Sequence, residues 1–407
     1  MKNYKLLIFI SSVLFLISCK ELKKEYKYDY NPELSTYVDF LNKNHKDAKD
    51  YILELFKKND IIILCERDHR ENTQYELITE IISDPRFIKN VGNVFTEVGM
   101  RNLNPEINDF IHSPKLSKKE INREIISLQR RCSFYPLWEK YNFYYFIKKL
   151  YQINQNLKPS EKINVYPTDI SLKLDSLDLD YYKSVWNKII YSRDSLMAQY
   201  IIDKFDSIQK AKGNRKKALI IMNYRHSFNN NFKFPNGKKA DNVGRYLFDK
   251  YQGKIANVLI NQLGIKEAKS DIDITWRPLQ GGKWDASFKV VKKDNVGFNF
   301  KNTPFGKDHF DLWQFFPHNY KYQDIFTGFI YYKSPDKYRI ITGINGLIDN
   351  SFLTTYKKRV NLWKKIIGER LENPTRDSII LYEYNRQNIR KKEKIDTVML
   401  QINKWLK

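Results

Sequence analysis

Two stretches of this chain carry a histidine shortly after a short apolar run. Residues 61–65 are apolar, and Glu66 and His69 follow them directly. Residues 218–222 form a second apolar run, which ends shortly before His226. A carboxylate three residues from an imidazole can orient the ring, which can then act as a general base toward water. Since the chain has only six histidines, this repetition predicts a site for acid–base chemistry.

Two further acidic residues lie within or at the end of apolar runs. Glu97 interrupts the run at 94–98, and Asp169 closes the run at 163–169. A buried carboxylate is costly unless it is paired, so Glu97 either forms a structural ion pair or faces a site. Any one of these ionisable residues, taken alone, is explained equally well as an ordinary turn or core residue. Four strand-like runs that each lead to an ionisable residue favour one shared site.

Short apolar runs alternate with longer amphipathic segments between residues 34 and 265. The predicted strands are 61–66, 94–97, 163–169, 218–224 and 255–260, and the predicted helices include 73–84, 134–155 and 180–212. This alternation is typical of an α/β fold with a mostly parallel central sheet flanked by helices. Ligands bind at the carboxyl ends of the strands in such sheets, which is where the ionisable residues lie.

The C-terminal third differs in character. Residues 269–350 contain glycine, proline and alternating aromatic stretches, and they predict a strand- and loop-rich extension of the sheet. Residues 351–407 predict a helical tail that is broken at Asn373 and Pro374. The α/β domain itself is expected to span residues 34–268.

The N-terminus predicts export. Residues 1–5 are basic, residues 6–17 are almost wholly apolar, and Leu16-Ile17-Ser18-Cys19 resembles the lipobox of bacterial lipoproteins. An apolar stretch of this length is typical of a signal peptide and too short to span a bilayer. We expect a signal peptide at 1–18 and a tether at 19–33. Lipidated Cys19 would be the only membrane contact, in the cell envelope of a Gram-negative-type bacterium, at its outer membrane.

The charge and the cysteines restrict the function further. The net charge is +24, but lysines are scattered along the whole chain and no nucleic-acid motif accompanies them. We therefore expect no nucleic-acid partner. Besides Cys19 there are only Cys65 and Cys132, which cannot form a disulfide framework, and no zinc-finger spacing is present.

The order of these residues resembles the erythromycin esterase-like family, which is related to the haem-uptake and Tiki-type proteins. The likeness covers roughly residues 50–265. The matching segments are Cys65-Glu66-Arg67-Asp68-His69 for the Gly-Glu-x-x-His motif, the strand with Glu97, the strand that ends at Asp169, Arg193-Asp194-Ser195-Leu196-Met197-Ala198, the strand that leads to His226, and Asn242-Val243-Gly244-Arg245-Tyr246-Leu247.

The resemblance implies a cleft in which a histidine activates water for attack on an ester without a metal. Its expected members are Glu66, His69, Glu97 and His226, with Asp169 and Arg193 as supporting residues. Tiki-type relatives are metal-dependent proteases, and the haem-uptake relatives bind haem. No cofactor is expected for an esterase-like site, but zinc, manganese or haem remain open.

The chain departs from the family pattern beside the glutamate. Cys65 replaces the glycine, and we expect a buried small hydrophobe there and not a nucleophile. Arg67 and Asp68 replace residues that are often small. They predict a charged pair at the mouth of the pocket, which argues against a large apolar substrate.

The sequence favours a lipid-anchored hydrolase that acts on a small-molecule substrate. His69 would be the general base, oriented by Glu66, while Glu97 and His226 would position water and stabilise developing charge. The first alternative is a non-catalytic lipoprotein that binds haem or another nutrient. A purely structural envelope protein is the second alternative, but it leaves the coincidence of acids and histidines unexplained.

Overall fold

The computed structural model describes residues 30–44, 46–174, 178–233, 239–268, 274–313, 320–368 and 376–406. The predicted signal peptide, the anchor Cys19 and most of the tether lie outside these ranges, as does the predicted helix break at Asn373 and Pro374. No helix in the described ranges combines the length and the apolar character needed to cross a bilayer.

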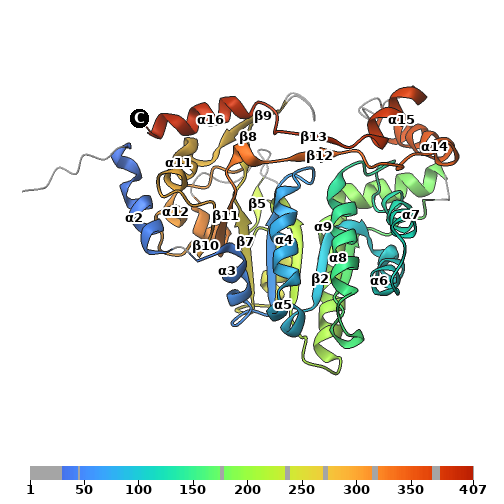
Figure 1. Cartoon of the computed structure of the whole chain (residues 1–407), viewed down its shortest axis with the longest axis horizontal. Helices are drawn as coiled ribbons and strands as arrows, with labels where there is room; N and C mark the ends of the chain where they lie inside the picture. Colours follow the sequence, from blue (N-terminus) through green and yellow to red (C-terminus); the bar gives the residue numbers. More distant parts are fainter. Residues whose placement is uncertain are drawn as a thin grey trace, which may run out of the picture.

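A seven-stranded sheet forms the centre of the molecule (Figure 1). Its strands are β1 (Ile61–Glu66), β2 (Asn93–Met100), β3 (Asn164–Asp169), β4 (Ala218–Asn223), β7 (Ile255–Ile260), β10 (Asn295–Asn299) and β11 (Gly328–Tyr332). The spatial order is β10-β11-β7-β1-β4-β2-β3, and all neighbours are parallel except β10 and β11. The predicted α/β fold with a mostly parallel central sheet is confirmed.

Both faces of the central strands are buried. In β1, Ile62 and Leu64 pack into one hydrophobic core, while Ile61, Ile63 and Cys65 pack into another. Because successive side chains point to opposite faces and helices cover both, the strand is apolar throughout and does not alternate with polar residues. Cys65 is fully buried, which confirms the prediction of a buried small hydrophobe.

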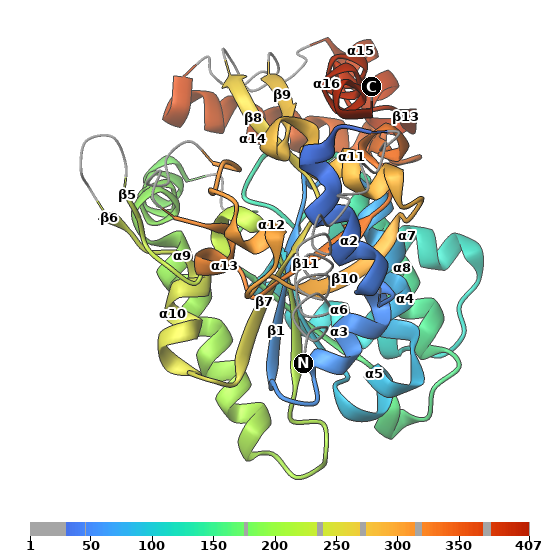
Figure 2. The ribbon, with the colours of Figure 1, turned by 90° about the vertical axis from the view of Figure 1, so that its left-hand side faces the viewer.

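The helices lie on the two sides of the sheet (Figure 2). One core contains side chains of α3 (Ala48–Leu55), α4 (Thr73–Ser83), α5 (Pro85–Asn90), α6 (Asn104–His112), α7 (Lys118–Gln129), α8 (Tyr141–Asn154), α14 (Asn350–Ile367) and α15 (Asp377–Asn385). The other contains side chains of α2 (Ser35–Lys43), α9 (Leu179–Lys210), α10 (Val243–Lys250), α11 (Lys283–Val290), α12 (Pro304–Lys307) and α13 (Tyr322–Ile325). The long helix α9 contributes to both cores, since its Tyr182 and Val185 pack into the first. A small third core includes residues of α16 (Ile395–Asn403).

Three small antiparallel pairs and several short 3-10 helices complete the described structure. The pairs are β5 (Phe232–Lys233) with β6 (Lys239–Ala240), β8 (Leu263–Ala268) with β9 (Ile274–Pro278), and β12 (Ile340–Thr342) with β13 (Asn388–Arg390). The 3-10 helices are Pro32–Leu34, Arg101–Leu103, Pro159–Glu161, Tyr224–His226, Leu279–Gly282, Pro335–Lys337 and Lys404–Leu406.

The topology places the ends of four strands side by side. The chain runs from β1 to β2 and β3, and only then returns to insert β4 between β1 and β2. In the register of the sheet, Glu66 of β1 lies beside Asn223 of β4. The carboxyl ends of β1, β4, β2 and β3 therefore form one continuous edge, the position at which open α/β sheets bind ligands.

The C-terminal region contributes to this sheet and to the covering of its edge. β10 and β11, which lie in the predicted extension at 269–350, continue the central sheet beyond β7. β12 and β13 cross the top of the molecule in Figure 1. Isolated bridges join Glu71 to Ile340 and Lys140 to Thr342, so this pair lies against the loops that follow β1 and precede α8.

Candidate functional site

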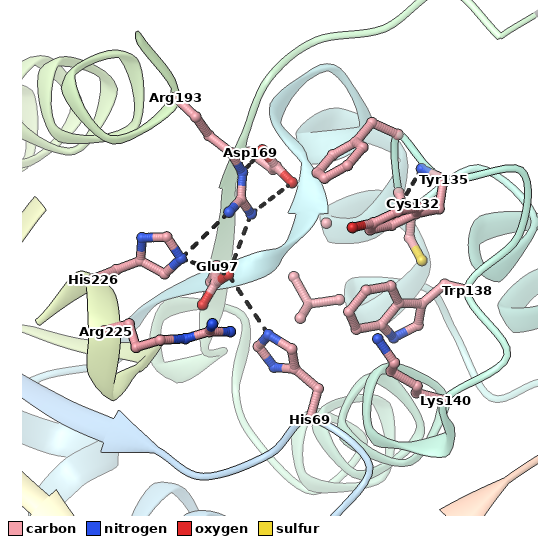
Figure 3. Close-up of a pocket in the computed structure, with 14 residues that line it drawn as sticks. His69, Glu97, Cys132, Tyr135, Trp138, Lys140, Asp169, Arg193, Arg225 and His226 are labelled. Atoms are coloured by element: carbon pink, nitrogen blue, oxygen red, sulfur yellow. Dashed lines mark hydrogen bonds and ion pairs between the residues drawn. The ribbon is translucent and has the colours of Figure 1, made fainter. Parts of the chain in front are cut away.

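The edge of the sheet brings the predicted residues together. Glu66 ends β1, His69 follows three residues later, Glu97 lies in β2, Asp169 ends β3 and His226 ends the short 3-10 helix after β4. Arg193 reaches the same place from α9 (Figure 3). All of the residues predicted for the site, catalytic and supporting, thus lie within one network of contacts.

Glu97 is at the centre of this network. Its Oε1 atom lies near three basic groups: 3.6 Å from Nε2 of His69, 3.4 Å from Nε2 of His226 and 3.2 Å from Nη2 of Arg193. Its Oε2 atom accepts a hydrogen bond of 2.8 Å from the backbone N–H of Asn223. Burial opposes the charge of Glu97, but His226 and His69 outweigh burial and hold its pKa well below the usual value. These partners explain how β2 tolerates a buried carboxylate.

His69 is held in a fixed orientation. Its Nδ1 atom lies 3.0 Å from Oε2 of Glu66, whose Oε1 atom accepts a hydrogen bond of 2.6 Å from the Tyr75 hydroxyl. That hydroxyl in turn accepts a hydrogen bond of 3.0 Å from the amide of Asn142. The ring of Trp138 packs edge-on against the imidazole, with ring centroids 5.3 Å apart. Nε2 of His69 is left facing the centre of the site.

His226 is held by a residue that we did not predict. Its Nδ1 atom lies 2.9 Å from both carboxylate oxygens of Asp194, and its Nε2 atom lies 3.4 Å from Nη1 of Arg193. Arg193 also donates to the two oxygens of Asp169, at 2.9 and 3.1 Å. Asp194 directly follows Arg193 in the segment that matches the family, so the sequence did contain a signal for it.

The surrounding carboxylates favour the charged form of both rings. Burial lowers the pKa of His69, but Glu66 and Glu97 outweigh burial and raise it to about 9. Burial also lowers the pKa of His226, where Asp194 and Glu97 outweigh it and raise the pKa to about 9. Most molecules therefore carry two imidazolium rings at neutral pH. The neutral, basic form of His69 becomes abundant only as the pH approaches 9.

A cavity of about 170 Å³ lies in front of these residues (Figure 3). Its far wall is formed by Cys132, Ser133, Phe134, Tyr135 and Trp138 from the segment between α7 and α8. A larger cleft of about 770 Å³ adjoins the cavity. Four residues line both spaces: His69, Tyr135, Lys140 and Arg225. No sequence motif marked the wall between α7 and α8, because its residues serve as a surface and not as reactive groups.

Comparisons with known proteins find solved structures that are similar to this chain at low sequence identity. No family model and no curated protein matches the chain. A protein from Bacillus cereus is 11% identical, with 73% of this chain and 96% of that chain covered and a TM-score of 0.44. The erythromycin esterase EreC in its open conformation is 8% identical, with coverages of 74% and 96% and a TM-score of 0.45. Haem-binding ChaN of Campylobacter jejuni is 16% identical, with coverages of 53% and 86% and a TM-score of 0.28.

Arg67 and Asp68 both line the larger cleft, but each pairs with other residues. Arg67 is buried, and its Nε and Nη2 atoms donate to the backbone and side-chain oxygens of Asn261, both at 2.5 Å. Asp68 instead pairs with Arg70 and with Lys392, at 2.7 and 2.6 Å. The side chain of Arg67 is directed into the protein, where Glu71 and oxygens from segments distant in the sequence accept its hydrogen bonds.

Three residues of the site fit a divalent cation. Glu66, His69 and Glu97 each offer one ligand atom, and these atoms lie within 4.8 Å of one another. Two carboxylates and an imidazole suit zinc or manganese. The same carboxylates favour a proton on His69, so a cation would compete with protons for this site.

Proposed function

We propose that this chain is a hydrolase in which His69 activates water for attack on an ester or a related bond. The observation that carries the proposal is the pair of Glu66 and His69. A buried carboxylate bonded to Nδ1 orients the ring, so that Nε2 faces a cavity. A carboxylate orients the basic histidine of serine hydrolases in the same way. The fold alone does not select a function, so the proposal depends on this geometry.

The reaction begins with the neutral ring of His69. Nε2 of His69 and Oε1 of Glu97 are 3.6 Å apart, too far for a direct hydrogen bond but suited to a water bonded to both. Nε2 takes a proton from this water while the water oxygen bonds to the ester carbonyl carbon, and the carbonyl oxygen receives the electron pair. When the intermediate collapses, the bond to the alcohol oxygen breaks and that oxygen takes the proton from His69.

Two basic groups on the other side of Glu97 support this reaction. His226 and Arg193 both contact Glu97 and both line the cavity. Positive charge that is already in place stabilises an oxyanion at no cost of reorganisation during the reaction. In this proposal His226 acts as a fixed imidazolium, held by Asp194, while His69 exchanges the proton.

A metal-dependent version of the same hydrolase is a second candidate. It is favoured by the cluster of Glu66, His69 and Glu97, which would hold zinc or manganese. The cation would supply a water of lowered pKa, and Tyr75 would keep Glu66 in place through its hydrogen bond. Metal analysis of the purified chain tests it: about one zinc or manganese per chain, lost in Glu66→Gln, would favour this version.

A screen of ester substrates tests the hydrolase itself. The full chain, purified in detergent, should cleave at least one ester, and His69→Gln should lose that turnover. The matched control is His309→Gln, because His309 is an exposed histidine that lines neither space. Turnover that survives in His69→Gln would contradict the proposal.

The alternative is a protein that binds haem or a nutrient without catalysis. The observation that favours it is the larger cleft of about 770 Å³, with His69, Tyr135 and Tyr224 on its wall. Glu97→Gln separates the two functions, because a binder would keep its ligand while a hydrolase would lose turnover. Stoichiometric haem in the purified chain, lost in His69→Ala, would favour the binder.

The lipid anchor is a separate proposal. It depends on the apolar N-terminal stretch and on Cys19, and it would place the hydrolase in the cell envelope, at the outer membrane. Labelling with a radioactive fatty acid, followed by membrane fractionation, tests it. We expect the label and the membrane association to disappear in Cys19→Ala.

A further inference from the structure

Two basic residues at the junction of the cavity and the larger cleft have no acidic partner. Lys140 and Arg225 line both spaces. Neither forms an ion pair with a carboxylate anywhere in the part of the chain that the structure describes. The other basic residues of the larger cleft are each paired: Arg67 with Glu71, and Arg70 and Lys392 with Asp68.

Neutral groups of the site hold these two cations in place. Nε of Arg225 donates to the side-chain oxygen of Asn223, at 3.2 Å, and the backbone N–H of the same Asn223 binds Glu97. The ammonium of Lys140 lies 3.9 Å from the centre of the Trp138 ring. In the view of Figure 3 the guanidinium of Arg225 extends toward the space between the two histidines, and Lys140 lies beside Trp138. Both charges are positioned without being neutralised.

The walls of the two spaces carry an excess of positive charge. The cavity is lined by the basic residues Lys140, Arg193 and Arg225 against the acidic residues Glu97 and Asp169, besides the two histidines. In the larger cleft five basic residues face three acidic ones. Burial lowers the pKa of Arg70, but two of these acids, Asp68 and to a smaller extent Glu139, help to raise it. A neutral ligand would leave the positive charges of Lys140 and Arg225 without a counter-charge in a concave site. An anion would be attracted to both side chains.

We propose that the substrate carries an oxyanion, a carboxylate or a phosphoryl group, which Lys140 and Arg225 bind at the junction. The fork of a guanidinium matches either group, and an ammonium adds a second charge. The cavity of about 170 Å³ is smaller than the ~300 Å³ from which ligand pockets usually begin. It would hold only the reacting bond, beside His69, and the larger cleft would hold the rest of the substrate.

The placement of the scissile bond rests on the proposed hydrolase function, but the anion site does not. Binding is therefore tested first, by calorimetric titration of the full chain in detergent with inorganic phosphate and, separately, with acetate. Loss of a hydrogen bond to a charged group should weaken binding about tenfold or more in Arg225→Gln and in Lys140→Gln. The controls are Arg123→Gln and Lys57→Gln, whose side chains are 73% and 74% exposed and line neither space.

The expected result is that at least one of the two anions binds, more weakly in both junction variants and unchanged in both controls. The proposal is overturned if neither anion binds to the wild-type chain. It is also overturned if all four variants bind as the wild type does, because the anion would then lie elsewhere.

A pair of esters then tests the placement of the substrate. p-Nitrophenyl acetate and p-nitrophenyl hemisuccinate share a leaving group, but only the second carries a carboxylate. We expect kcat/KM of the wild type to favour the hemisuccinate about tenfold or more, and the ratio to fall toward one in Arg225→Gln, mainly through KM. The ratio should not change in Arg123→Gln.

The two proposals fail in different ways. If both esters are cleaved at equal rates and His69→Gln abolishes the cleavage of both, the proposed hydrolase is supported and the oxyanion site is contradicted. If phosphate binding depends on Lys140 and Arg225 while no ester is cleaved, the oxyanion site is supported and the proposed hydrolase is contradicted.

Discussion

The two histidines beside Glu97 are held in similar ways but in different surroundings. Each directs Nδ1 at a carboxylate of its own: His69 at Glu66, at 3.0 Å, and His226 at Asp194, at 2.9 Å. Each directs Nε2 at Glu97, at 3.6 and 3.4 Å. Carboxylates raise the pKa of both to about 9. Titration alone would not tell the two rings apart.

Their neighbours do separate them. The side chain of Glu66 is 1% exposed at the end of a strand, whereas that of Asp194 is 24% exposed on a helix. Nε2 of His226 also lies 3.4 Å from the guanidinium of Arg193, while His69 borders both the cavity and the larger cleft. Both rings line the cavity, but only His69 also lines the larger cleft. In the proposed hydrolase, His69 therefore exchanges a proton with the ligand, and His226 supplies a fixed charge.

The largest expected effect separates the two rings directly. His69→Gln should lower kcat/KM about 10⁴-fold, the upper end for general acid–base catalysis. His226→Gln should lower it only about 10²-fold, as expected for the loss of one stabilising charge. Steady-state kinetics on the best substrate of the ester screen measure both. A loss in His226→Gln equal to or greater than that in His69→Gln would reverse the assignment.

Glu97→Gln should affect both rings at once. It should lower kcat/KM by about 10²- to 10³-fold, because water loses a charged acceptor and the cationic groups lose their shared carboxylate. The pKa values of His69 and His226 should both fall from about 9. NMR titration of the ring protons measures this. The control is Glu106→Gln, because Glu106 is an exposed glutamate paired with Arg131. A fall in pKa confined to one ring would show that Glu97 does not act on both histidines alike.

The dependence of activity on pH should report both rings. Since His69 must be neutral while His226 must stay an imidazolium, kcat/KM should rise about tenfold per pH unit below pH 9 and fall again above it. Glu66→Gln removes a group that raises the pKa of His69, so the rising limb should move to lower pH. Asp194→Asn should leave the rising limb nearly unchanged and move the falling limb to lower pH. A rising limb that follows Asp194 would identify His226 as the base.

Stability should show the smallest effect. The pKa of His226 is about 9 in the folded chain, above the ordinary histidine value of 6.5. The proton on His226 therefore stabilises the fold fully below pH 6.5, and this contribution is lost as the pH rises through 9. The free energy of unfolding of the wild type should therefore fall by on the order of 2 kcal/mol more than that of His226→Gln between pH 6.5 and 9.5. Urea denaturation at both pH values measures it; equal losses would argue that His226 is not protonated in the folded chain.

The sequence by itself determined the parts of the site that are local. The apolar runs of β1 and β4 predict buried strands because helices cover both faces of a parallel sheet. Glu66 and His69 lie three residues apart at the end of a strand, so their contact needs little beyond the local turn. Glu97 stood out because a carboxylate within an apolar strand requires partners.

Only the tertiary structure decided which distant residues meet. Asp194 holds His226 from 32 residues away, and Arg67 donates two of its hydrogen bonds to Asn261, 194 residues away. Lys140 directly precedes α8 and Arg225 follows β4, yet both line the junction. Periodicity along a chain tells which face of an element is buried, but not which element packs against it. The order of strands in the sheet, which the sequence does not state, brought these charges together.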